Sequence, residues 1–481
     1  MQAVSNTYSS KINTDYSQGA LPLGRGKRMQ THFLHKAGQT LMLAASLLPL
    51  ALSSASSQQY HVTDLGVLSG FQESYANQIN NSGQVVGDSY IFNSSIEGSL
   101  WDSGNLTGLG SGIQANGINN SGQIAGYEGN DAIIWQNGSI TNLGILSGDR
   151  YSRGVGIEDG GMVVGWSVGD TIDQAFFYGM TPVFTYKMIG LGTLGGYASW
   201  ANAINYNAVI SGSSYLSGNS VSHAFACNPH FEYLGHVFIG TTYPSMTDLN
   251  PTWPYRTDAN GMNNNNLIVG DQWESNLNSF PVVWQFDQNT GSIDWEDSFA
   301  LPYSDASYSC AANAINNNNM AVGSYWSSSH SVACLWDMNG DVWDLNTCIA
   351  LSAGWHLYNA QGINDNGQIV GAGANPGGST HGFLLTPIAL SGMHFKYGSL
   401  IGGNKDTGTI SLNYPAVFNT RIFLSSSNPA VVSVPASLTV RAGHSSAGVA
   451  AKTAAVSTNT TVTITATYNG HSVSSAITVE P

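Results

Sequence analysis

The chain has 481 residues and a formal net charge of −15 at pH 7, and only 9% of its residues are charged. An average globular domain has roughly 25% charged residues, so the composition is unlike that of an ordinary helical enzyme. The 56 glycines and the 10% aromatic content instead indicate an all-β protein with a packed core.

The charges are divided unevenly along the chain. Residues 56–386 carry 26 acidic and four basic side chains, whereas residues 387–481 carry two acidic and five basic ones. We exclude nucleic acid as a partner of the larger part, because that binding requires clustered Lys and Arg. The change in composition near residue 388 predicts a domain boundary.

The N-terminal part contains an apolar run of 12 residues, 41–52, followed by Ser53-Ser54-Ala55. Four basic residues precede the run: Arg25, Lys27, Arg28 and Lys36. The pattern predicts a signal peptide over 29–55 that begins at Met29, with residues 1–28 as a non-native upstream extension. The run is too short to span a bilayer as a stable helix. We therefore expect a secreted, extracellular or cell-envelope protein with no transmembrane segment after signal removal. The alternative is an uncleaved membrane anchor.

One phrase, Ala-x-x-Ile-Asn-x-x-Gly-x-x-x-Gly, recurs seven times with variation. The copies cover residues 76–87, 115–126, 154–165, 201–212, 259–270, 312–323 and 360–371. Their final glycines are 39, 39, 47, 58, 53 and 48 residues apart, which suits propeller blades of about 40–50 residues. The copies lack the three- and four-residue apolar spacing of helical repeats.

Each copy predicts a four-stranded antiparallel sheet. In the second copy, apolar segments flank the turn 119–122, and two further strands follow at 132–135 and 140–144. Asn and Gly stand in the turn because hairpins require a positive φ there. The last copy has no fourth strand, but a matching segment, 60–66, precedes the first copy. We expect this segment to complete the last sheet and close a seven-bladed β-propeller over residues 58–388.

These repeats resemble the HAF-type extracellular repeat family of bacterial proteins. The resemblance covers roughly residues 60–385 and is carried by His223-Ala224-Phe225, a weaker His381-Gly382-Phe383, Asp64-Leu65-Gly66, the segment 191–196 and the repeated Ile-Asn phrase. The chain departs from the pattern at Glu158-Asp159, and Asn replaces Gly near 265–266 and 318–319. The resemblance implies a secreted β-propeller-like protein and no defined activity.

Residues 389–481 consist of short alternating segments at the spacing of a β-sandwich. The segments 426–431 and 465–470 resemble bacterial Ig-like domains. This resemblance implies an Ig-like β-sandwich that serves as a stalk or spacer.

Several short motifs imitate catalytic or cofactor signatures. The segment 190–195 matches the dinucleotide fingerprint and 165–169 matches the nucleophile elbow, but both lie in repeated scaffold positions and lack the following helix. The Asn-rich turns are mostly neutral, whereas calcium requires several carboxylates. The histidines have no metal-ligand spacing. We therefore expect no cofactor and no metal.

The four cysteines are Cys227, Cys310, Cys334 and Cys348, which match no zinc pattern and allow three pairings. Of these pairings we favour a disulfide between Cys310 and Cys348, because both are expected in loops that flank one repeat. Cys334 lies in an apolar segment and is interpreted as a small core residue.

The sequence favours a monomeric binding or structural module whose loops recognise a ligand. Five tryptophans are candidate ligand-binding residues: Trp253, Trp273, Trp295, Trp326 and Trp355. Their convergence at one mouth of the propeller would support the binding of carbohydrate or peptide. The alternative is a polysaccharide hydrolase or lyase that uses Asp294, Glu296 and Asp297 beside Trp295. A third possibility is an architectural envelope protein without a ligand.

Overall fold

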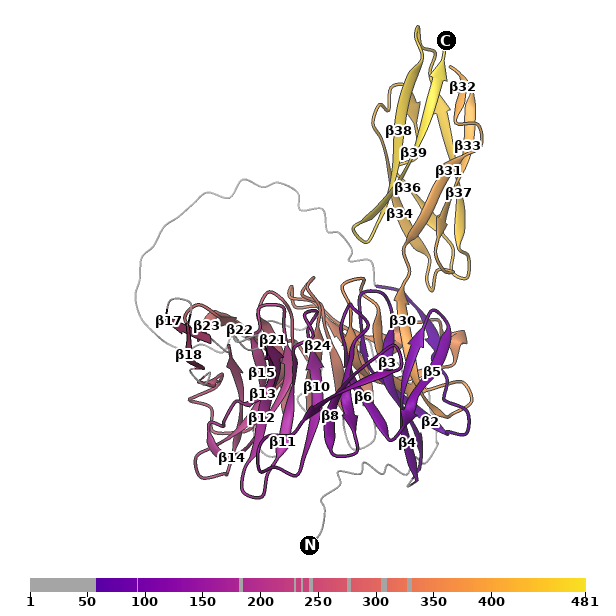
Figure 1. Cartoon of the computed structure of the whole chain (residues 1–481). Coiled ribbons are helices and arrows are strands. Elements are labelled where there is room, and N and C mark those ends of the chain that lie inside the picture. Colours follow the sequence, from indigo (N-terminus) through magenta and orange to yellow (C-terminus); the bar gives the residue numbers. More distant parts are fainter. Residues whose placement is uncertain are drawn as a thin grey trace, which may run out of the picture.

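The computed structural model describes residues 58–481, except 93, 181–184, 229–230, 235–236, 242–244, 275–277, 304–308 and 327–330 (Figure 1). The described residues form β-sheets and two short 3-10 turns, η1 (Leu345–Thr347) and η2 (Leu351–Ala353). The predicted all-β class is confirmed. The predicted signal peptide and upstream extension lie outside the described residues.

Each repeat copy folds into four strands that pair mostly with their neighbours in the chain. The first sheet contains β2 (Glu73–Ile79), β3 (Val85–Ile91), β4 (Ser95–Asp102) and β5 (Asn105–Ser111). The second contains β6 (Ile113–Ile118), β7 (Ile124–Glu128), β8 (Asp131–Gln136) and β9 (Ser139–Gly144). The third contains β10 (Tyr151–Ile157), β11 (Val163–Val168), β12 (Asp173–Met180) and β13 (Tyr186–Gly190).

The later copies follow the same order. The fourth sheet contains β14 (Gly195–Ile204), β15 (Ile210–Leu216), β16 (Ser222–Cys227) and β19 (Thr247–Asp248). One parallel pair, Asp173 with Ala198, joins it to the third sheet, so that these eight strands are continuous. The fifth contains β20 (Thr257–Met262), β21 (Leu267–Trp273), β22 (Ser279–Asp287) and β23 (Ser292–Ala300). The sixth contains β24 (Ser309–Ile315), β25 (Ala321–Trp326), β26 (Ser331–Trp336) and β27 (Val342–Asp344). A separate hairpin, β17 (Phe231–Leu234) and β18 (Val237–Thr241), follows β16.

The last sheet takes its fourth strand from the N-terminal end of the large unit. It contains β28 (His356–Ile363), β29 (Ile369–Ala374), β30 (Thr380–Pro387) and the strand β1 (Tyr60–Asp64). β1 pairs antiparallel with β30, with Tyr60 opposite Pro387 and Asp64 opposite Phe383. The expected pairing of this N-terminal segment with the last copy is confirmed, and it covers what would otherwise be the exposed edge of β30.

The repeat phrase explains how tightly the first two strands of each sheet approach. The register shifts by one residue after the repeat alanine, for example between Ala76 and Gln78, which is a β-bulge. At Gly87 an added Cβ would overlap the carbonyl oxygen of Tyr75, so only glycine fits. The same clash with the preceding strand recurs at Gly126 and Gly165.

The apolar core lies between successive sheets. Val86 and Leu109 of the first sheet pack against Ile118 and Ile133 of the second. The last sheet packs against the first in the same way, through one apolar cluster that consists of Leu65, Ala76, Ile79, Val85, Val370 and Leu384. The first and seventh sheets are therefore packed neighbours although almost 300 residues separate their inner strands.

The C-terminal unit consists of two sheets that enclose their own core. One contains β31 (Leu390–Phe395), β33 (Lys405–Leu412), β37 (Ser446–Thr453) and β35 (Val432–Ser433). The other contains β32 (Ser399–Ile401), β39 (His471–Glu480), β38 (Thr460–Tyr468), β34 (Thr420–Ser426) and β36 (Ser437–Val440). Ile388, one residue after β30, already belongs to this core.

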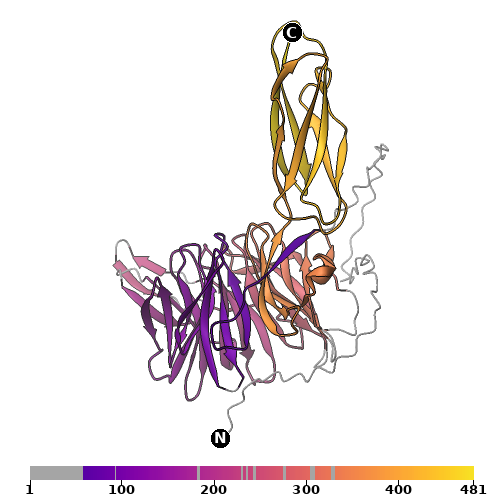
Figure 2. The same cartoon turned by 90° about the vertical axis from the view of Figure 1, so that its right-hand side faces the viewer.

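The C-terminal unit contacts the large unit through the residues just before and within β1 (Figure 2). Gln59 Nε2 donates to Thr420 Oγ1 at 2.7 Å and to Tyr468 Oη at 2.9 Å, and its Oε1 accepts from the Val417 N–H at 2.7 Å. The His61 ring stacks on Tyr414 at 4.1 Å. Gln59 is only 2% exposed, so the junction between the units is a packed contact.

Candidate functional site

The repeat asparagine forms the turn between the first two strands of its sheet. Asn80 Oδ1 accepts from the backbone N–H groups of Ser82 and Gln84 at 3.1 and 2.9 Å. The turn also needs a residue with positive φ, which is Gly83 at 80°. Asn266 and Asn319 replace that glycine with φ values of 60° and 61°. Asparagine tolerates this conformation better than most residues, which explains the Asn-rich copies.

The amide nitrogen of the same asparagine joins one sheet to the next. Nδ2 donates to the backbone carbonyl of the equivalent turn residue in the following sheet, at 2.9–3.0 Å. These bonds run from Asn80 to Asn119, Asn119 to Glu158, Asn205 to Asn263, Asn263 to Asn316, Asn316 to Asn364 and Asn364 to Asn80. The last bond returns to the first sheet. Asparagine serves both purposes because its side chain contains an acceptor and a donor.

A second set of bonds follows the first around the turns. The residue after each repeat asparagine, for example Asn81, donates its backbone N–H to the side-chain oxygen of the equivalent residue in the following sheet, for example Asn120. These distances are 2.8–3.0 Å. The turns 80–83, 119–122, 158–161, 205–208, 263–266, 316–319 and 364–367 surround a polar central pocket. We call this end of the sheets the Asn face.

The opposite end of the sheets is rich in aromatic residues, and we call it the aromatic face. In each sheet the first strand, such as β2, runs toward the Asn turn, and the second strand, such as β3, runs away from it. The last residues of the second strands therefore lie at the aromatic face, as do the connections between sheets. The aromatic residues of this face include Tyr75, Tyr90, Tyr127, Tyr151, Tyr197, Trp200, Tyr215, Trp253 and Trp273. The C-terminal unit stands beyond the Asn end of β30 (Figure 1), which leaves the aromatic face uncovered by it.

One cluster on the aromatic face belongs to the first three sheets. Tyr75, which is 36% exposed, meets Tyr90 edge to face at 5.3 Å. The Arg153 guanidinium lies over the Tyr127 ring at 3.7 Å and over the Tyr151 ring at 4.7 Å. Burial raises the pKa of Tyr75 to about 12. The Tyr75 phenol is therefore a neutral hydrogen-bond donor at physiological pH.

A second cluster belongs to the fourth and fifth sheets. Tyr197 is 44% exposed and stacks on Tyr215 at 4.7 Å, while Trp200 meets Tyr215 edge to face at 5.9 Å. In the next sheet, Trp253 Nε1 donates to the Trp273 carbonyl at 2.8 Å. Such clusters combine flat apolar surface with polar edges, which is the usual composition of ligand sites.

Three charged residues lie beside the second cluster. Arg256 Nε donates to Asp258 Oδ2 at 2.5 Å, and its guanidinium lies 5.6 Å from the Trp273 ring. Asp258 is the direct cross-strand neighbour of Asp271. Burial, and then the charge of Asp258, raise the pKa of Asp271 to about 7. Two acids with different environments are the arrangement used in acid–base chemistry.

Asp88 occupies the same place in the first sheet that Asp271 occupies in the fifth, directly after the repeat glycine. It is 3% exposed and accepts from the Ala115 N–H at 3.1 Å and from Asn77 Nδ2 at 2.9 Å. Burial raises its pKa to about 6 against the opposing effect of these two hydrogen bonds. Asp88 therefore connects the first sheet to the second.

The five predicted tryptophans do not form one cluster. Trp253 and Trp273 are brought together, and Trp326 ends β25 at the same end of the sheets as Trp273. Trp355 packs against the core of the last sheet, edge to face with Phe383 at 6.4 Å. Trp295 is 56% exposed on the edge strand β23.

The predicted acidic cluster lies on the same edge strand. Asp294 and Trp295 are in β23, and the side chains of Glu296 and Asp297 lie outside the described residues. Asp258 and Asp271 were not identified from the sequence. They flank the repeat phrase at fixed positions, immediately before its alanine and immediately after its last glycine, so an alignment of the seven copies could have found them.

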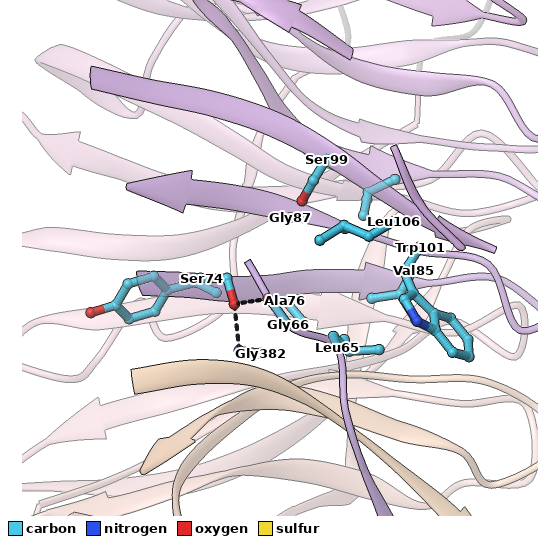
Figure 3. Close-up of a pocket in the computed structure, with 12 residues that line it drawn as sticks. Leu65, Gly66, Ser74, Ala76, Val85, Gly87, Ser99, Trp101, Leu106 and Gly382 are labelled. Carbon is cyan, nitrogen blue, oxygen red and sulfur yellow. Dashed lines mark hydrogen bonds between the residues drawn. The ribbon is translucent and has the colours of Figure 1, made fainter. Parts of the chain in front are cut away.

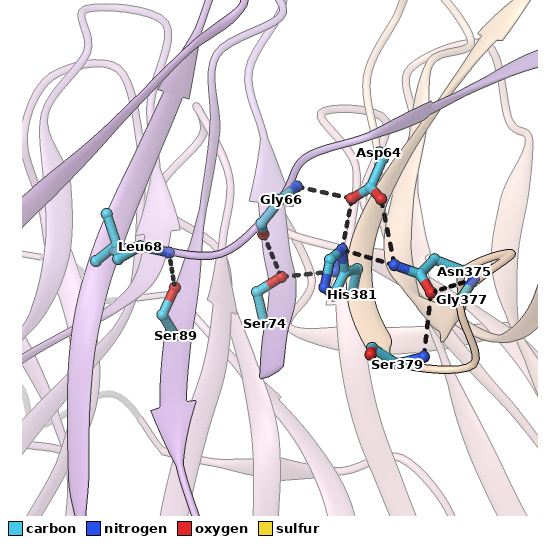
Figure 4. Close-up of polar contacts among 10 residues, drawn as sticks. Asp64, Gly66, Leu68, Ser74, Ser89, Asn375, Gly377, Ser379 and His381 are labelled. Carbon is cyan, nitrogen blue, oxygen red and sulfur yellow. Dashed lines mark hydrogen bonds and ion pairs between the residues drawn. The ribbon is translucent and has the colours of Figure 1, made fainter. Parts of the chain in front are cut away.

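The histidine of the His-Ala-Phe triplet and the aspartate of the Asp-Leu strand form a pair within one sheet. His381 Nδ1 lies 2.8 Å from Asp64 Oδ1, which also accepts from the Gly66 N–H at 2.8 Å (Figure 4). His223 Nδ1 makes the equivalent contact with Asp248 at 2.9 Å and is 1% exposed. The structure assigns these motif residues to joining the third and fourth strands, in agreement with a packing role.

Figure 3 shows a second cavity, between the first and last sheets. Leu65, Val85 and Trp101 line it, and Ser74 Oγ donates to the Gly66 carbonyl at 2.6 Å while accepting from the Gly382 N–H at 3.0 Å. Its volume of about 20 Å³ holds roughly one water molecule. This cavity is too small for an organic ligand.

All four cysteines are free and buried. The predicted disulfide between Cys310 and Cys348 is therefore not present: Cys310 lies within β24 and Cys348 follows η1, where its thiol donates to the Asp344 carbonyl at 3.5 Å. Burial raises the pKa values of both thiols to about 12. Such thiols are unreactive at neutral pH.

Within the described residues, no group of three or more His, Cys, Asp or Glu side chains could hold a metal ion. In that same part of the chain, no helix is long and apolar enough to cross a membrane.

No family model matches the chain, and no curated protein matches it. Among solved structures, one described as "Structural basis for Dscam isoform specificity" is similar at 8% sequence identity, over 88% of this chain and 100% of that chain, with a TM-score of 0.16. A TM-score this low supports no argument about fold or function.

Proposed function

We propose that the seven sheets are the blades of a seven-bladed β-propeller of the HAF-type repeat family, followed by an Ig-like β-sandwich. Three observations support this: the pairing of β1 with β30, the packing of the last sheet on the first, and the hydrogen bond from Asn364 back to Asn80. A signal peptide over 29–55 would place the protein outside the cell. An experimental structure with the sheets stacked in a line would contradict the propeller.

The function that we propose is the binding of a carbohydrate chain on the aromatic face. The supporting observation is the set of partly exposed tyrosines, such as Tyr75 and Tyr197, beside carboxylates and amides on one side of the sheets. Sugar rings present C–H surfaces that stack on aromatic rings and hydroxyls that bind carboxylates and amides. The acidic composition of residues 56–386 favours a neutral chain over an anionic one.

A glycan array followed by calorimetry on the secreted protein tests this function. We expect Tyr75→Ala and Tyr197→Ala to weaken binding of a neutral polysaccharide at least about tenfold, because exposed aromatic anchors dominate such interfaces. Tyr186→Ala is the matched control, since Tyr186 is 50% exposed but lies on β13 away from these clusters. If peptides but no glycans bind in a Tyr75-dependent manner, the carbohydrate assignment is wrong.

A polysaccharide hydrolase or lyase is the second candidate, and the adjacent acids Asp258 and Asp271 favour it. With a pKa near 7, Asp271 is a suitable general acid, while Asp258 beside Arg256 is a suitable carboxylate base. Release of reducing ends from polysaccharides, abolished in both Asp258→Asn and Asp271→Asn, would support this activity. Loss of the same activity in Asp294→Asn would instead assign the catalytic acids to the cluster on β23.

A further inference from the structure

The circuit of hydrogen bonds on the Asn face is interrupted once. Among the described residues, six of the seven steps between turns have both an amide-to-carbonyl bond and a backbone-to-side-chain bond. The step from the third sheet to the fourth has neither. It is the place where the third copy departs from the repeat phrase.

The cause of the interruption is the identity of two residues. Glu158 replaces the repeat asparagine, and its oxygens accept from the Gly160 and Met162 N–H groups at 2.7 and 2.9 Å. It therefore forms its own turn but has no amide nitrogen to donate to the Asn205 carbonyl. In the fourth turn, Tyr206 occupies the place of an asparagine and offers no amide oxygen to the Asp159 N–H.

Two backbone groups are thus left without their usual partners at one side of the central pocket. The Asn205 carbonyl accepts from the Ala208 N–H at 2.9 Å and retains one free lone pair, and the Asp159 N–H makes no hydrogen bond with another described residue. Beside them Tyr206 is 72% exposed. All three residues line the central pocket.

We propose that this gap is a binding site for an N-acetylated amino sugar. The acetamido carbonyl accepts from the Asp159 N–H, the acetamido N–H donates to the Asn205 carbonyl, and the sugar packs on the Tyr206 ring. An amide is the matching group, because protein amides complete the same two bonds at the other six steps. The oxygens of the Glu158 and Asp159 carboxylates already accept hydrogen bonds from Gly160, Met162 and Asn120. Their negative charge repels anionic sugars.

This site lies on the Asn face, so it goes beyond the function proposed for the aromatic face. The two faces are tested by different variants. Loss of binding in Tyr197→Ala reports on the aromatic face, whereas changes at 158 and 206 report on the gap.

The experiment is a titration of the full secreted chain with N-acetylglucosamine and its trimer, followed by calorimetry and by nuclear magnetic resonance of the ligand acetyl group. Glucose and a cellotriose probe are the matched uncharged ligands without the acetamide. We expect the acetylated ligands to bind at least about tenfold more tightly than either control, because an unmatched donor and acceptor cost that much or more.

The variants Glu158→Asn and Tyr206→Asn supply the missing protein amide groups. We expect each to lower the affinity for N-acetylglucosamine at least about tenfold while leaving or raising the thermal midpoint, and Tyr206→Phe to retain binding. Equal binding of glucose, unchanged affinity in both asparagine variants, or only water in the gap of a crystal soaked at saturating ligand would overturn the proposal.

Discussion

The Asn face and the aromatic face lie at opposite ends of the same sheets, but residues and hydrogen bonds recur from sheet to sheet much more regularly on the Asn face. On the Asn face, equivalent residues make equivalent hydrogen bonds, such as Asn263 to Asn316 and Asn316 to Asn364. On the aromatic face, the residue that precedes the repeat alanine is Tyr75 in the first copy, Arg153 in the third and Asp258 in the fifth. The regular end joins the sheets through the same hydrogen bonds at each step, whereas the contacts between sheets at the variable end, such as Arg153 on Tyr127, are particular to one pair of sheets.

The repeat glycine should be the most sensitive position of the regular part. In Gly87→Ala the new methyl group would overlap the Tyr75 carbonyl, and backbone cannot move aside as a side chain can. We expect a loss of about 3–5 kcal/mol in the free energy of unfolding, measured by denaturant titration. Gly392→Ala is the control, since nothing lies within 4 Å of its added Cβ. Equal effects of the two substitutions would contradict this view of the repeat.

The two roles of the repeat asparagine can be separated at Asn316. Asn316→Ala removes the acceptor for the Asn318 and Met320 N–H groups and the donor to the Asn364 carbonyl. We expect a loss of about 2–3 kcal/mol for alanine and about 1 kcal/mol for Asn316→Asp, which keeps the acceptor. Thermal unfolding measures both, and an aspartate as harmful as alanine would show that the acceptor role is unimportant.

On the variable face, Asp271 should make stability depend on pH. Its folded pKa of about 7 lies above the ordinary value of 3.8, so the folded protein binds this proton more tightly than the unfolded chain. The stabilisation by protonation is therefore lost as the pH rises from about 4 to about 7. We expect Asp271→Asn to be equally stable near pH 4 and more stable than the natural protein at pH 8 by at most about 4 kcal/mol, since each pKa unit corresponds to about 1.4 kcal/mol. If the stability gained in Asp271→Asn did not depend on pH, the raised pKa of Asp271 would be wrong.

The smallest expected effect is a gain at the interrupted step. Glu158→Asn keeps an acceptor for its own turn and adds a donor for the Asn205 carbonyl, as in the other copies. We expect a gain of about 1 kcal/mol in the free energy of unfolding. The matched control is Asn119→Glu, which creates the same interruption at the previous step and should cost a similar amount. A loss of stability in Glu158→Asn would show that the carboxylate stabilises its own turn by more than the added bond to the Asn205 carbonyl.

The strands could be predicted well because each copy repeats the same physical constraints. The turn asparagine, the positive-φ glycine and the glycine at the close strand approach all constrain the backbone locally. The pairing of β1 with β30 was also predictable, since one Asp-Leu-Gly strand was missing at the end and present at the start. The ligand residues were harder to identify. Tryptophan is an abundant residue that also fills cores, as Trp355 does against Phe383.

The repeat, its strands and the position of the closing strand follow from the pattern of residues alone, because hydrogen bonding and chain turning act over a few residues. The folded arrangement was needed to show that Asp258 stands beside Asp271 and Arg256, that Cys310 and Cys348 are free thiols, and that one step of the amide circuit is open. These features depend on distances between separate strands and sheets. Such distances follow from packing, which no local pattern of residues specifies.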